Sequence, residues 1–373
     1  QLDKLDYCQP FNQGFGGSFE LATRIAKKTP EGINRIFYTI CGSTAVETAI
    51  KIAIAYHRAK GDSKRFRFVG RERGYHGMNI GATTVGGMIN NIKTFASVLM
   101  PGVQHMRHTH LPEHKFVKGQ PETGVELAED LERIAMNFGG ENIAACIVEP
   151  IAGSTGTLVP PKGYLKRLRE ICDKHGILLI FDEVITGWGR TGSAFAAQEW
   201  GVTPDIMTMA KATTNGVVPM GVVAVKEEMY DAVLDASKAP EGTPELFHGY
   251  TYSAIPVAVA AALAVQDIFD KEDIFKRAKE MSPYFQDGLH SLKDLKEVVS
   301  IRGYGMMGGI EMKMKEKPGK SGFQTFKHCY DAGVNFKNTG DTLIIAPQFI
   351  CEKKHIDEII DKLRTGISNY SKS

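Results

Sequence analysis

The sequence predicts an α/β fold, with a large domain built on a mostly parallel sheet and a smaller C-terminal α+β domain. Short apolar segments without polar alternation are typical of strands that are buried on both faces. Amphipathic charged segments alternate with them, as helices do between the strands of a parallel sheet. Near residue 257 this pattern changes, because an Ala-rich segment, further charged segments and short strands follow.

The large domain is expected over residues 12–256. Its predicted strands, in chain order, are 35–40, 66–70, 142–149, 177–182, 205–210 and 221–225. Helices are predicted at 43–60 and 162–175, and Gly176 stands where a glycine commonly follows the last helical turn. Because ligands bind at the carboxyl ends of strands in such sheets, residues at these ends are the first candidates for a site.

The smaller domain is expected over residues 257–373. A helix is predicted after Pro256, since proline is well tolerated in the first helical turn. Two charged helical segments follow, and then short strands at 297–302, 308–314 and 342–346 and a charged final helix. The letters of G-x-G-x-x-G occur at 303–308, but a strand-like segment follows instead of a helix, which argues against a nicotinamide dehydrogenase.

The composition is that of an ordinary globular protein. Of 373 residues, 24% are charged and 43% apolar, and the formal net charge of +2 predicts no strong attraction to nucleic acid or membrane surfaces. The six cysteines lack zinc-type spacing and are expected to be reduced thiols, which favours a cytoplasmic protein. Four histidines between His105 and His114 are irregularly spaced, so we expect a solvated loop and no metal site.

The segment GILLIFDEVITGWGR (176–190) raises a question about charge. Its apolar strand ends on two adjacent acids, Asp182 and Glu183, although an unpaired buried carboxylate is costly. Either both acids lie in solvent at the strand end, or Asp182 faces a cation that something else supplies. Lys211 follows another apolar strand; it is either a surface lysine or a desolvated amine whose pKa is lowered, as Schiff-base chemistry needs.

Two glycine-containing segments could hold a ligand. In CGSTAVETA (41–49), Thr44 and Glu47 fit a capping box at a helix start, and Gly42 would let the backbone approach a phosphate. A plain helix start is the alternative. In RGYHG (73–77), Tyr75 and His76 could stack on a flat ligand or form a packed turn.

Together these segments resemble the class III aminotransferases, which bind pyridoxal 5′-phosphate (PLP) and have the transferase fold type I. The resemblance is carried by LLIFDEVITGWGRTG, PDIMTMAK and HGYTYSA and extends from about Leu5 to Leu363. It is strongest to the ω-amino-acid:pyruvate group, which includes β-alanine–pyruvate and taurine–pyruvate aminotransferases. It implies a homodimer and transamination from an ω-amino donor to pyruvate by a ping-pong mechanism.

The resemblance also implies roles for individual residues. Lys211 would bind PLP covalently and move the proton, Asp182 would pair with the protonated pyridine nitrogen, and Glu149 would lie near Asp182 and the phenolic oxygen. That ring nitrogen would be the cation of the question above. The remaining cofactor contacts implied by the motifs are phosphate binding by Gly42, Ser43 and Thr44, ring contacts from Tyr75, His76 and Val184, and a phosphate contact from Thr251 of the other subunit.

The sequence departs from the family pattern in three places. Enzymes that use 2-oxoglutarate carry a glutamate and an arginine where this chain has Ser154 and Ile344, so 2-oxoglutarate is disfavoured. Lys337 replaces an arginine that binds the substrate carboxylate; a lysine lacks the bidentate fork, so taurine is as good a candidate donor as β-alanine. Residues 1–11 are expected to be the remnant of an N-terminal segment. An aminomutase, a decarboxylating relative and a PLP-binding protein without turnover remain alternatives.

Overall fold

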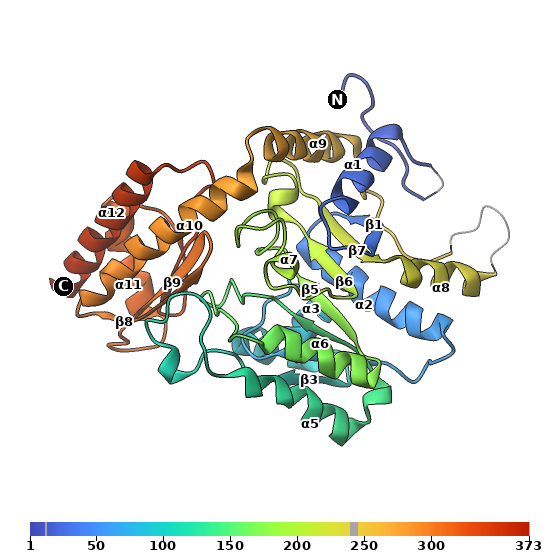
Figure 1. The fold of residues 1–373 in the computed structure, drawn as a ribbon, viewed down its shortest axis with the longest axis horizontal. Helices are drawn as coiled ribbons and strands as arrows, with labels where there is room; N and C mark the ends of the chain where they lie inside the picture. The colour runs from blue at the N-terminus through green and yellow to red at the C-terminus, as the bar shows by residue number, and fades with distance from the viewer. Residues whose placement is uncertain (12, 239–244, 373) are drawn as a thin grey trace.

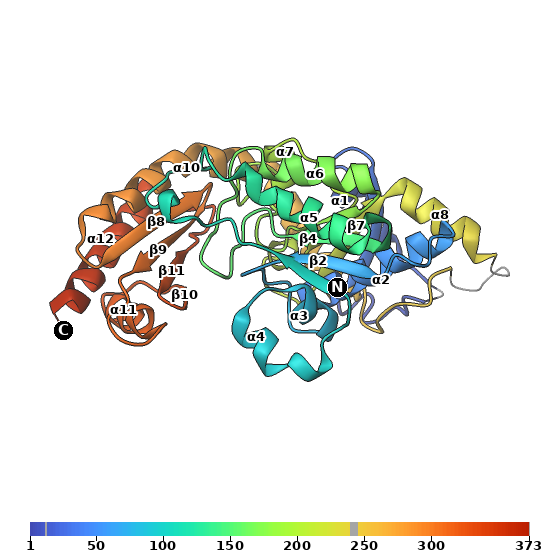
Figure 2. The same cartoon turned by 90° about the horizontal axis from the view of Figure 1, so that it is seen from below.

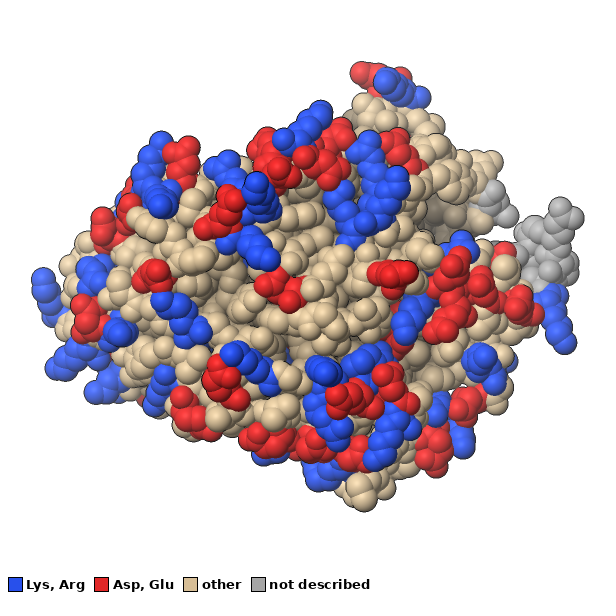
Figure 3. All heavy atoms as spheres, in the orientation of Figure 1, with Lys and Arg blue, Asp and Glu red and all other residues tan. Residues whose placement is uncertain are grey.

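Two sheets of different size organise the chain in the computed structural model, which describes residues 1–11, 13–238 and 245–372. Figure 1 shows the large sheet among its helices at the centre and right, and the small sheet at the left beside the C-terminus. Figure 2, seen from below, shows the two sheets side by side along the long axis. On the face in Figure 3, acidic and basic side chains are interspersed, as the small net charge predicts.

The large sheet has seven strands in the order β1-β7-β6-β5-β4-β2-β3. β7 runs antiparallel to both of its neighbours, and the other pairings are parallel. The mostly parallel sheet expected from the sequence is therefore confirmed. The strands are β1 (Ile33–Thr39), β2 (Arg67–Arg71), β3 (Val103–Met106), β4 (Ile143–Val148), β5 (Leu178–Asp182), β6 (Ile206–Met209) and β7 (Gly221–Lys226).

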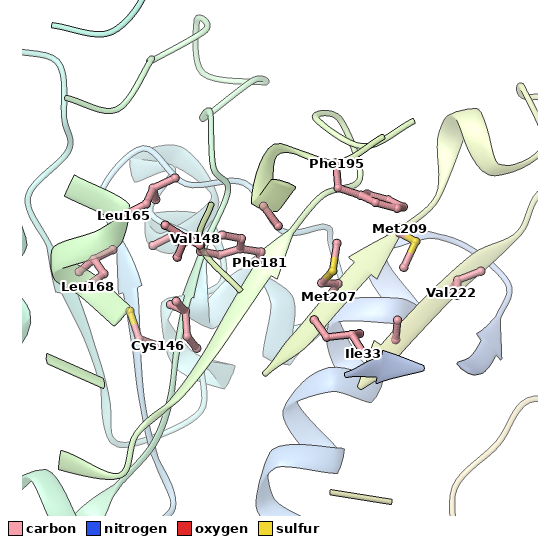
Figure 4. Packing of buried hydrophobic residues seen from close by; sticks show 14 of the residues in the cluster. Ile33, Cys146, Val148, Leu165, Leu168, Phe181, Phe195, Met207, Met209 and Val222 are labelled. Carbon is pink, nitrogen blue, oxygen red and sulfur yellow. The ribbon is translucent and has the colours of Figure 1, made fainter. Parts of the chain in front are cut away.

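Helices cover both faces of the large sheet because its strands are apolar on both sides. Along β5, Leu179 and Phe181 pack into one hydrophobic cluster and Leu178 and Ile180 into another. The first cluster includes residues of α1 (Gly16–Ala26), α5 (Glu129–Phe138), α6 (Tyr164–His175) and α9 (Pro256–Lys271). Figure 4 shows part of it, with Phe181 of β5 near Leu165 of α6. The second includes residues of α2 (Gly42–Ala59), α3 (Ile80–Val85) and α8 (Glu227–Ser237).

The small sheet is antiparallel, with strand order β10-β11-β9-β8. Its strands are β8 (Val298–Tyr304), β9 (Met307–Met312), β10 (Lys337–Thr339) and β11 (Thr342–Ile345). β8, β9 and β11 share a hydrophobic cluster with α10 (Ile274–His290), α11 (Lys320–Asp331) and α12 (Lys353–Lys372). The buried residues of α9 belong to the large core instead. The domain boundary between residues 256 and 257 stays a prediction. From the packing of α9 against the large core, we propose that the two domains divide at the start of α10.

Two further short helices, α4 (Ile89–Thr94) and α7 (Ala196–Glu199), lie in connections of the large sheet. All six cysteines are free, with four of them buried. No helix in the described parts of the chain is both long and apolar enough to span a membrane.

Candidate active site

A pocket of about 310 Å³ opens where the carboxyl ends of β4, β5 and β6 meet the start of α2. The large parallel sheet explains its location, since strand ends and helix starts meet at this edge. Eight residues proposed from the sequence line it: Gly42, Ser43, Tyr75, His76, Glu149, Asp182, Val184 and Lys211. Sequence reasoning did not single out the other lining side chains, including Ile185, Thr214, Val218, Pro219 and Met220.

The two acids at the end of β5 point in different directions and do different things. The Asp182 carboxylate borders the pocket and accepts hydrogen bonds from the Val184 amide (3.1 Å) and the Thr208 hydroxyl (3.2 Å). Glu183 is fully buried and accepts hydrogen bonds from the backbone amides of Ala196 (3.1 Å) and Ala197 (2.8 Å). Both acids are therefore buried, and the alternative that they lie in solvent is wrong.

Burial gives Glu183 an unusual affinity for a proton. It raises the pKa of this carboxyl from an ordinary 4.5 to about 7, although the Thr186 hydroxyl and the two backbone amides counteract the shift. Glu183 thus fixes the loop that follows β5 and satisfies amides at the start of α7. This structural role is separate from the pocket, which Asp182 alone of the two acids borders.

His76 holds the far oxygen of Asp182. Its Nδ1 lies 2.8 Å from Asp182 Oδ2, and both side chains are buried. Its Nε2 is also buried and has no hydrogen-bond partner among the described residues. Since a carboxylate can only accept, Nδ1 is the donor, and the contact orients Asp182 within the pocket.

Glu149 is a second buried carboxyl group on the pocket wall. Oε1 accepts the Tyr75 amide (2.9 Å) and Oε2 accepts the Gly153 amide (2.9 Å). Burial raises the pKa of Glu149, and the nearby charge of Asp182 raises it further, whereas His76 lowers it. These bonds connect the end of β4 to the loop that carries Tyr75. Glu149 therefore holds Tyr75 in position on the pocket lining and also places a carboxyl group there.

Lys211 follows β6 in a strained backbone conformation. Its φ of 41° falls in the left-handed region, where residues other than glycine are uncommon and often functional. The side chain is open to the pocket, but protein surrounds it on its other sides. This desolvation lowers the pKa of the Lys211 amine, the positive charge of Lys337 lowers it further, and Asp182 and Glu149 oppose the shift.

The start of α2 differs from the capping box predicted from the sequence. Cys41 is the N-cap, and the Thr44 hydroxyl bonds to both the Cys41 amide (3.0 Å) and the Cys41 carbonyl (2.9 Å). Glu47 instead accepts the Ala82 amide (3.3 Å). The Thr44–Glu47 box is therefore wrong, because the helix begins earlier than expected, and Thr44 lies outside the pocket lining.

Ser43 and Gly42 remain available at this helix start. Ser43 Oγ accepts the Met78 amide (3.2 Å), which leaves its own proton free to be donated. A Cβ added to Gly42 would lie 3.3 Å from both methyl carbons of Val184. The first amides of a helix have no partner within the helix and favour anions. The glycine therefore avoids a tight contact with Val184 on the pocket lining, beside this helix start.

Lys337 and Thr251 lie outside the lining of the pocket. Lys337 is on β10 directly opposite Ile344 of β11, and Ile344 is in turn opposite Gly309 of β9. Directly opposed residues share a face of the sheet, and a Cβ on Gly309 would lie 2.6 Å from the Gly156 carbonyl oxygen of the large domain. Lys337 is thus on the face that contacts the large domain. Thr251 is exposed, and its carbonyl accepts the Tyr7 hydroxyl (3.1 Å).

The histidines between 105 and 114 do not form the solvated loop expected from the sequence. His114 is buried and lies 3.0 Å from the Thr123 carbonyl, and His105 is half-buried with its Nε2 near the Gly86 carbonyl (2.8 Å). Burial lowers the pKa of His105. Within residues 1–11, 13–238 and 245–372, no group of three or more His, Cys, Asp or Glu side chains could hold a metal ion.

The pocket residues fit PLP by their chemistry. Lys211 supplies an amine with a lowered pKa, Asp182 supplies an anchored carboxylate, and α2 supplies the amides of its first turn, beside Gly42. Tyr75 and Val184 offer an aromatic and an apolar surface on the pocket lining. A planar ring that carries an aldehyde, a basic nitrogen and a phosphate has a partner here for each group.

Comparison with known proteins agrees with this chemistry. A family model described as aminotransferase class-III matches residues 12–367. The chain is 50% identical to an omega-aminotransferase of Caulobacter vibrioides over 366 residues, which is 98% of this chain and 82% of that protein. It is 44% identical to a beta-alanine–pyruvate aminotransferase of Pseudomonas aeruginosa, over 100% of this chain and 83% of that protein.

The solved structures give the same result. An omega transaminase from Pseudomonas jessenii in complex with PMP superposes with a TM-score of 0.93 at 28% identity, over 100% of this chain and 83% of that one. A transaminase solved with L-Ala has a TM-score of 0.93 at 30% identity, over 100% of this chain and 89% of that one. The chain belongs to the class III aminotransferases, which are PLP-dependent enzymes.

Proposed function

We propose that the protein transfers an amino group from an ω-amino donor to pyruvate and releases an aldehyde and alanine. The observation that supports this most is the placement of Lys211 and Asp182 in one pocket, with Lys337 on the face of the small sheet directed at the large domain. The relatives named ω-aminotransferase and β-alanine–pyruvate aminotransferase support the donor class and the acceptor.

PLP, when bound, supplies the electron-accepting ring and the aldehyde that takes up the amino group. Lys211 is suited to bind it and then to move a proton, because its lowered pKa keeps a larger fraction of the amine neutral. Donor and acceptor would use the same pocket in turn, which predicts ping-pong kinetics. Ser43 and the first amides of α2 would hold the phosphate, and Gly42 would leave room for it.

Asp182 would keep the ring nitrogen protonated. Its position is fixed by His76 at one oxygen and by Val184 and Thr208 at the other, so little reorganisation is needed when a cation arrives. We propose that Tyr75 and Val184 enclose the ring from its two faces. Glu149 would lie near the phenolic oxygen, held by its two backbone amide contacts.

The preference for pyruvate over 2-oxoglutarate as acceptor follows from the residues beside Lys337 on the small sheet. Ile344 stands directly opposite Lys337, so an apolar side chain occupies the position where a second cation would be needed for 2-oxoglutarate. Ser154 is buried in the large-domain loop 153–157, the loop whose Gly156 carbonyl meets the same face. Arg302 lies on the same face, opposite Gly309, but is paired with Glu311 (2.6 Å). Binding by Lys337 would suit a single acid group on the substrate, as in pyruvate or an ω-amino acid.

The donor is proposed to carry an acid group that Lys337 binds. An ammonium acts as a point charge and does not demand the planar geometry of a carboxylate, so a tetrahedral sulfonate can bind as well. Taurine is therefore proposed beside β-alanine. Replacing Lys337 by arginine should shift the preference from taurine toward β-alanine.

We also propose that the protein forms a homodimer in the cytoplasm. A groove of about 570 Å³ lies between α1, β1, α8 and residues 245–254, with many apolar lining residues, and a second copy would cover it. Thr251 lies beside this groove, exposed, as a residue that reaches into a partner's pocket would be. The six free cysteines support a reducing compartment. Sedimentation at micromolar concentration tests the dimer; a monomer would contradict it.

The proposed reaction is tested with the PLP-loaded protein, pyruvate and single donors. Alanine should form from β-alanine or taurine in amounts equal to the donor consumed, with parallel lines in double-reciprocal plots. Release of carbon dioxide in place of alanine, or an isomerised donor without use of pyruvate, would contradict transamination. Absence of any turnover would leave only PLP binding.

A further inference from the structure

Arg190 lies at the end of a loop that begins in the pocket. The loop leaves β5 after Asp182, and Val184 lines the pocket on the way. Trp188, which is fully buried, donates its Nε1 hydrogen to the Thr213 hydroxyl (3.0 Å), in the short turn that begins with Lys211. The loop is therefore connected to Asp182 at its start and, through Trp188, to the turn that begins with Lys211.

The Arg190 side chain connects this loop to the small sheet. One of its terminal nitrogens, Nη1, donates to the carbonyl oxygens of Met306 (2.7 Å) and Pro347 (2.8 Å), and the guanidinium lies 4.3 Å from the centre of the Phe349 ring. In the backbone, the Met306 amide donates to the Arg190 carbonyl (2.9 Å). Met306 is in the β8–β9 turn and Pro347 follows β11, so Arg190 holds two separate points of the small domain.

Within the described part of the chain, no carboxylate pairs with this arginine. Its side-chain hydrogen bonds go to backbone carbonyls, and burial lowers the pKa of its guanidinium to about 10. Arg190 is half-buried, and a partly desolvated cation that bonds to backbone carbonyls without a carboxylate partner costs free energy relative to a paired one. Because these carbonyls belong to the β8–β9 turn and to the segment after β11, the bonds tie the loop to the small sheet at two points.

Arg190 binds the segment that follows β11, and β11 pairs with β10, which carries Lys337. Pro347 closely follows β11, where Ile344 is directly opposite Lys337 on β10. At the other side of the sheet, Arg302 donates its Nε hydrogen to the Gly156 carbonyl (2.7 Å), in the row of Gly309 and Ile344. Two arginines thus fix the small sheet against the large domain, and Arg190 is the one connected to the Lys211 turn.

We propose that Arg190 is a positioning residue that sets the spacing between Lys337 and Lys211, and thereby the length of donor that the site accepts. The inference rests on the proposed function, since it requires that Lys337 binds the acid group of the donor. An amine without an acid group does not use this spacing. The effect of Arg190 should therefore appear in the discrimination between the two kinds of donor.

The test measures kcat/KM of the PLP-loaded enzyme for β-alanine and for propylamine, with pyruvate as acceptor. Arg190→Lys and Arg190→Gln should lower the β-alanine/propylamine ratio about tenfold, mostly through KM for β-alanine, because small displacements are costly in oriented sites. Arg277→Gln is the matched control: Arg277 also bonds a small-domain carbonyl, that of Ile350, but from the surface. Its ratio should equal that of the wild type.

A double-mutant cycle separates positioning from a general loss of stability. In Lys337→Ala the ratio is already lowered, so adding Arg190→Lys should lower it no further. Additive losses, or an equal fall for both amines, would overturn the inference. If Arg190→Gln does not fold, hydrogen exchange in Arg190→Lys holoenzyme decides: faster exchange of β10 and β11 amides supports the proposal, and unchanged exchange contradicts it. Wild-type enzyme that gives no alanine from either β-alanine or taurine would instead refute the proposed function.

Discussion

Replacing Gly42 by alanine should weaken PLP binding about tenfold without unfolding the protein. The new Cβ would lie 3.3 Å from both methyl carbons of Val184 and 3.6 Å from the Ala210 Cβ. The contacts with Val184 are tighter than ordinary packing, so Val184 must move by a few tenths of an ångström. Val184 is only half-buried and borders the pocket, and the pocket is therefore the direction in which it can yield.

The magnitude follows from the cost of overpacking. Inserting a methyl group into a packed region costs about 1–3 kcal/mol. If about 1.4 kcal/mol of this appears in the holoenzyme, where PLP competes with Val184 for space, the Kd for PLP rises about tenfold. Gly42 begins α2 in helical backbone, so alanine introduces no conformational strain there.

The assay is a titration of apoprotein with PLP, followed by absorbance. Gly16→Ala is the control, because a Cβ at Gly16 in the first turn of α1 meets nothing within 4 Å. Its Kd for PLP should equal that of the wild type. An unchanged Kd in Gly42→Ala, or a loss of apoprotein stability as large as the loss of PLP affinity, would refute the reasoning.

Three further predictions concern side chains of the site and its support. Removing the donor to Asp182 in His76→Phe should lower PLP affinity by about tenfold or more in the same titration, because a bond to a charged group contributes about 1.5–3 kcal/mol; a Kd like that of the wild type would contradict this. The folded state raises the pKa of Glu183 from 4.5 to about 7, so this group stabilises the fold fully below pH 4.5 and progressively less up to pH 7. Urea unfolding measures the free energy of unfolding of wild type minus that of Glu183→Gln. Between pH 4.5 and pH 7 this difference should fall by about 3 kcal/mol, and a constant difference would refute the shift. Lys337→Ala should raise KM for taurine and β-alanine at least about tenfold but not KM for propylamine, in steady-state assays; equal effects on all three would rule out acid-group recognition.

The buried strands of the large domain were predictable because they are apolar on both faces. β4 and β5 carry uninterrupted apolar runs, and β6 is broken only by Thr208. The positions where these runs end are enough to predict that Asp182 and Lys211 share one edge of the sheet. Gly176 takes a left-handed conformation at the end of α6, as its position after the helix predicts.

The strands that were missed lack such a signal. β3 has the sequence VQHM and is mostly half-buried, and β10 is three polar residues long. Their strand character comes from pairing with β2 and β11, which local sequence does not encode. The helix α2 was predicted to within one residue, but its cap was misjudged, because Thr44 caps the helix from within its first turn and not from in front of it.

Contacts between distant segments account for what sequence could not predict in the site. Nothing near Glu183 indicates that it binds amides of residues 196 and 197, and nothing near Trp188 indicates its bond to Thr213. The connection of Arg190 to the small domain is equally non-local. Successive residues of a strand face opposite sides of the sheet. Two adjacent acids at a strand end, such as Asp182 and Glu183, can therefore be expected to have different partners.

The most direct test of the account is to locate the lysine that binds PLP. The protein is loaded with PLP, reduced with borohydride and digested, and the modified peptide is identified by mass spectrometry. The account predicts a phosphopyridoxyl group on Lys211 alone, and no modification at this position or another after Lys211→Ala. Modification of a different lysine, or none in the wild-type protein, would contradict the central claim that Lys211 and Asp182 form a PLP site.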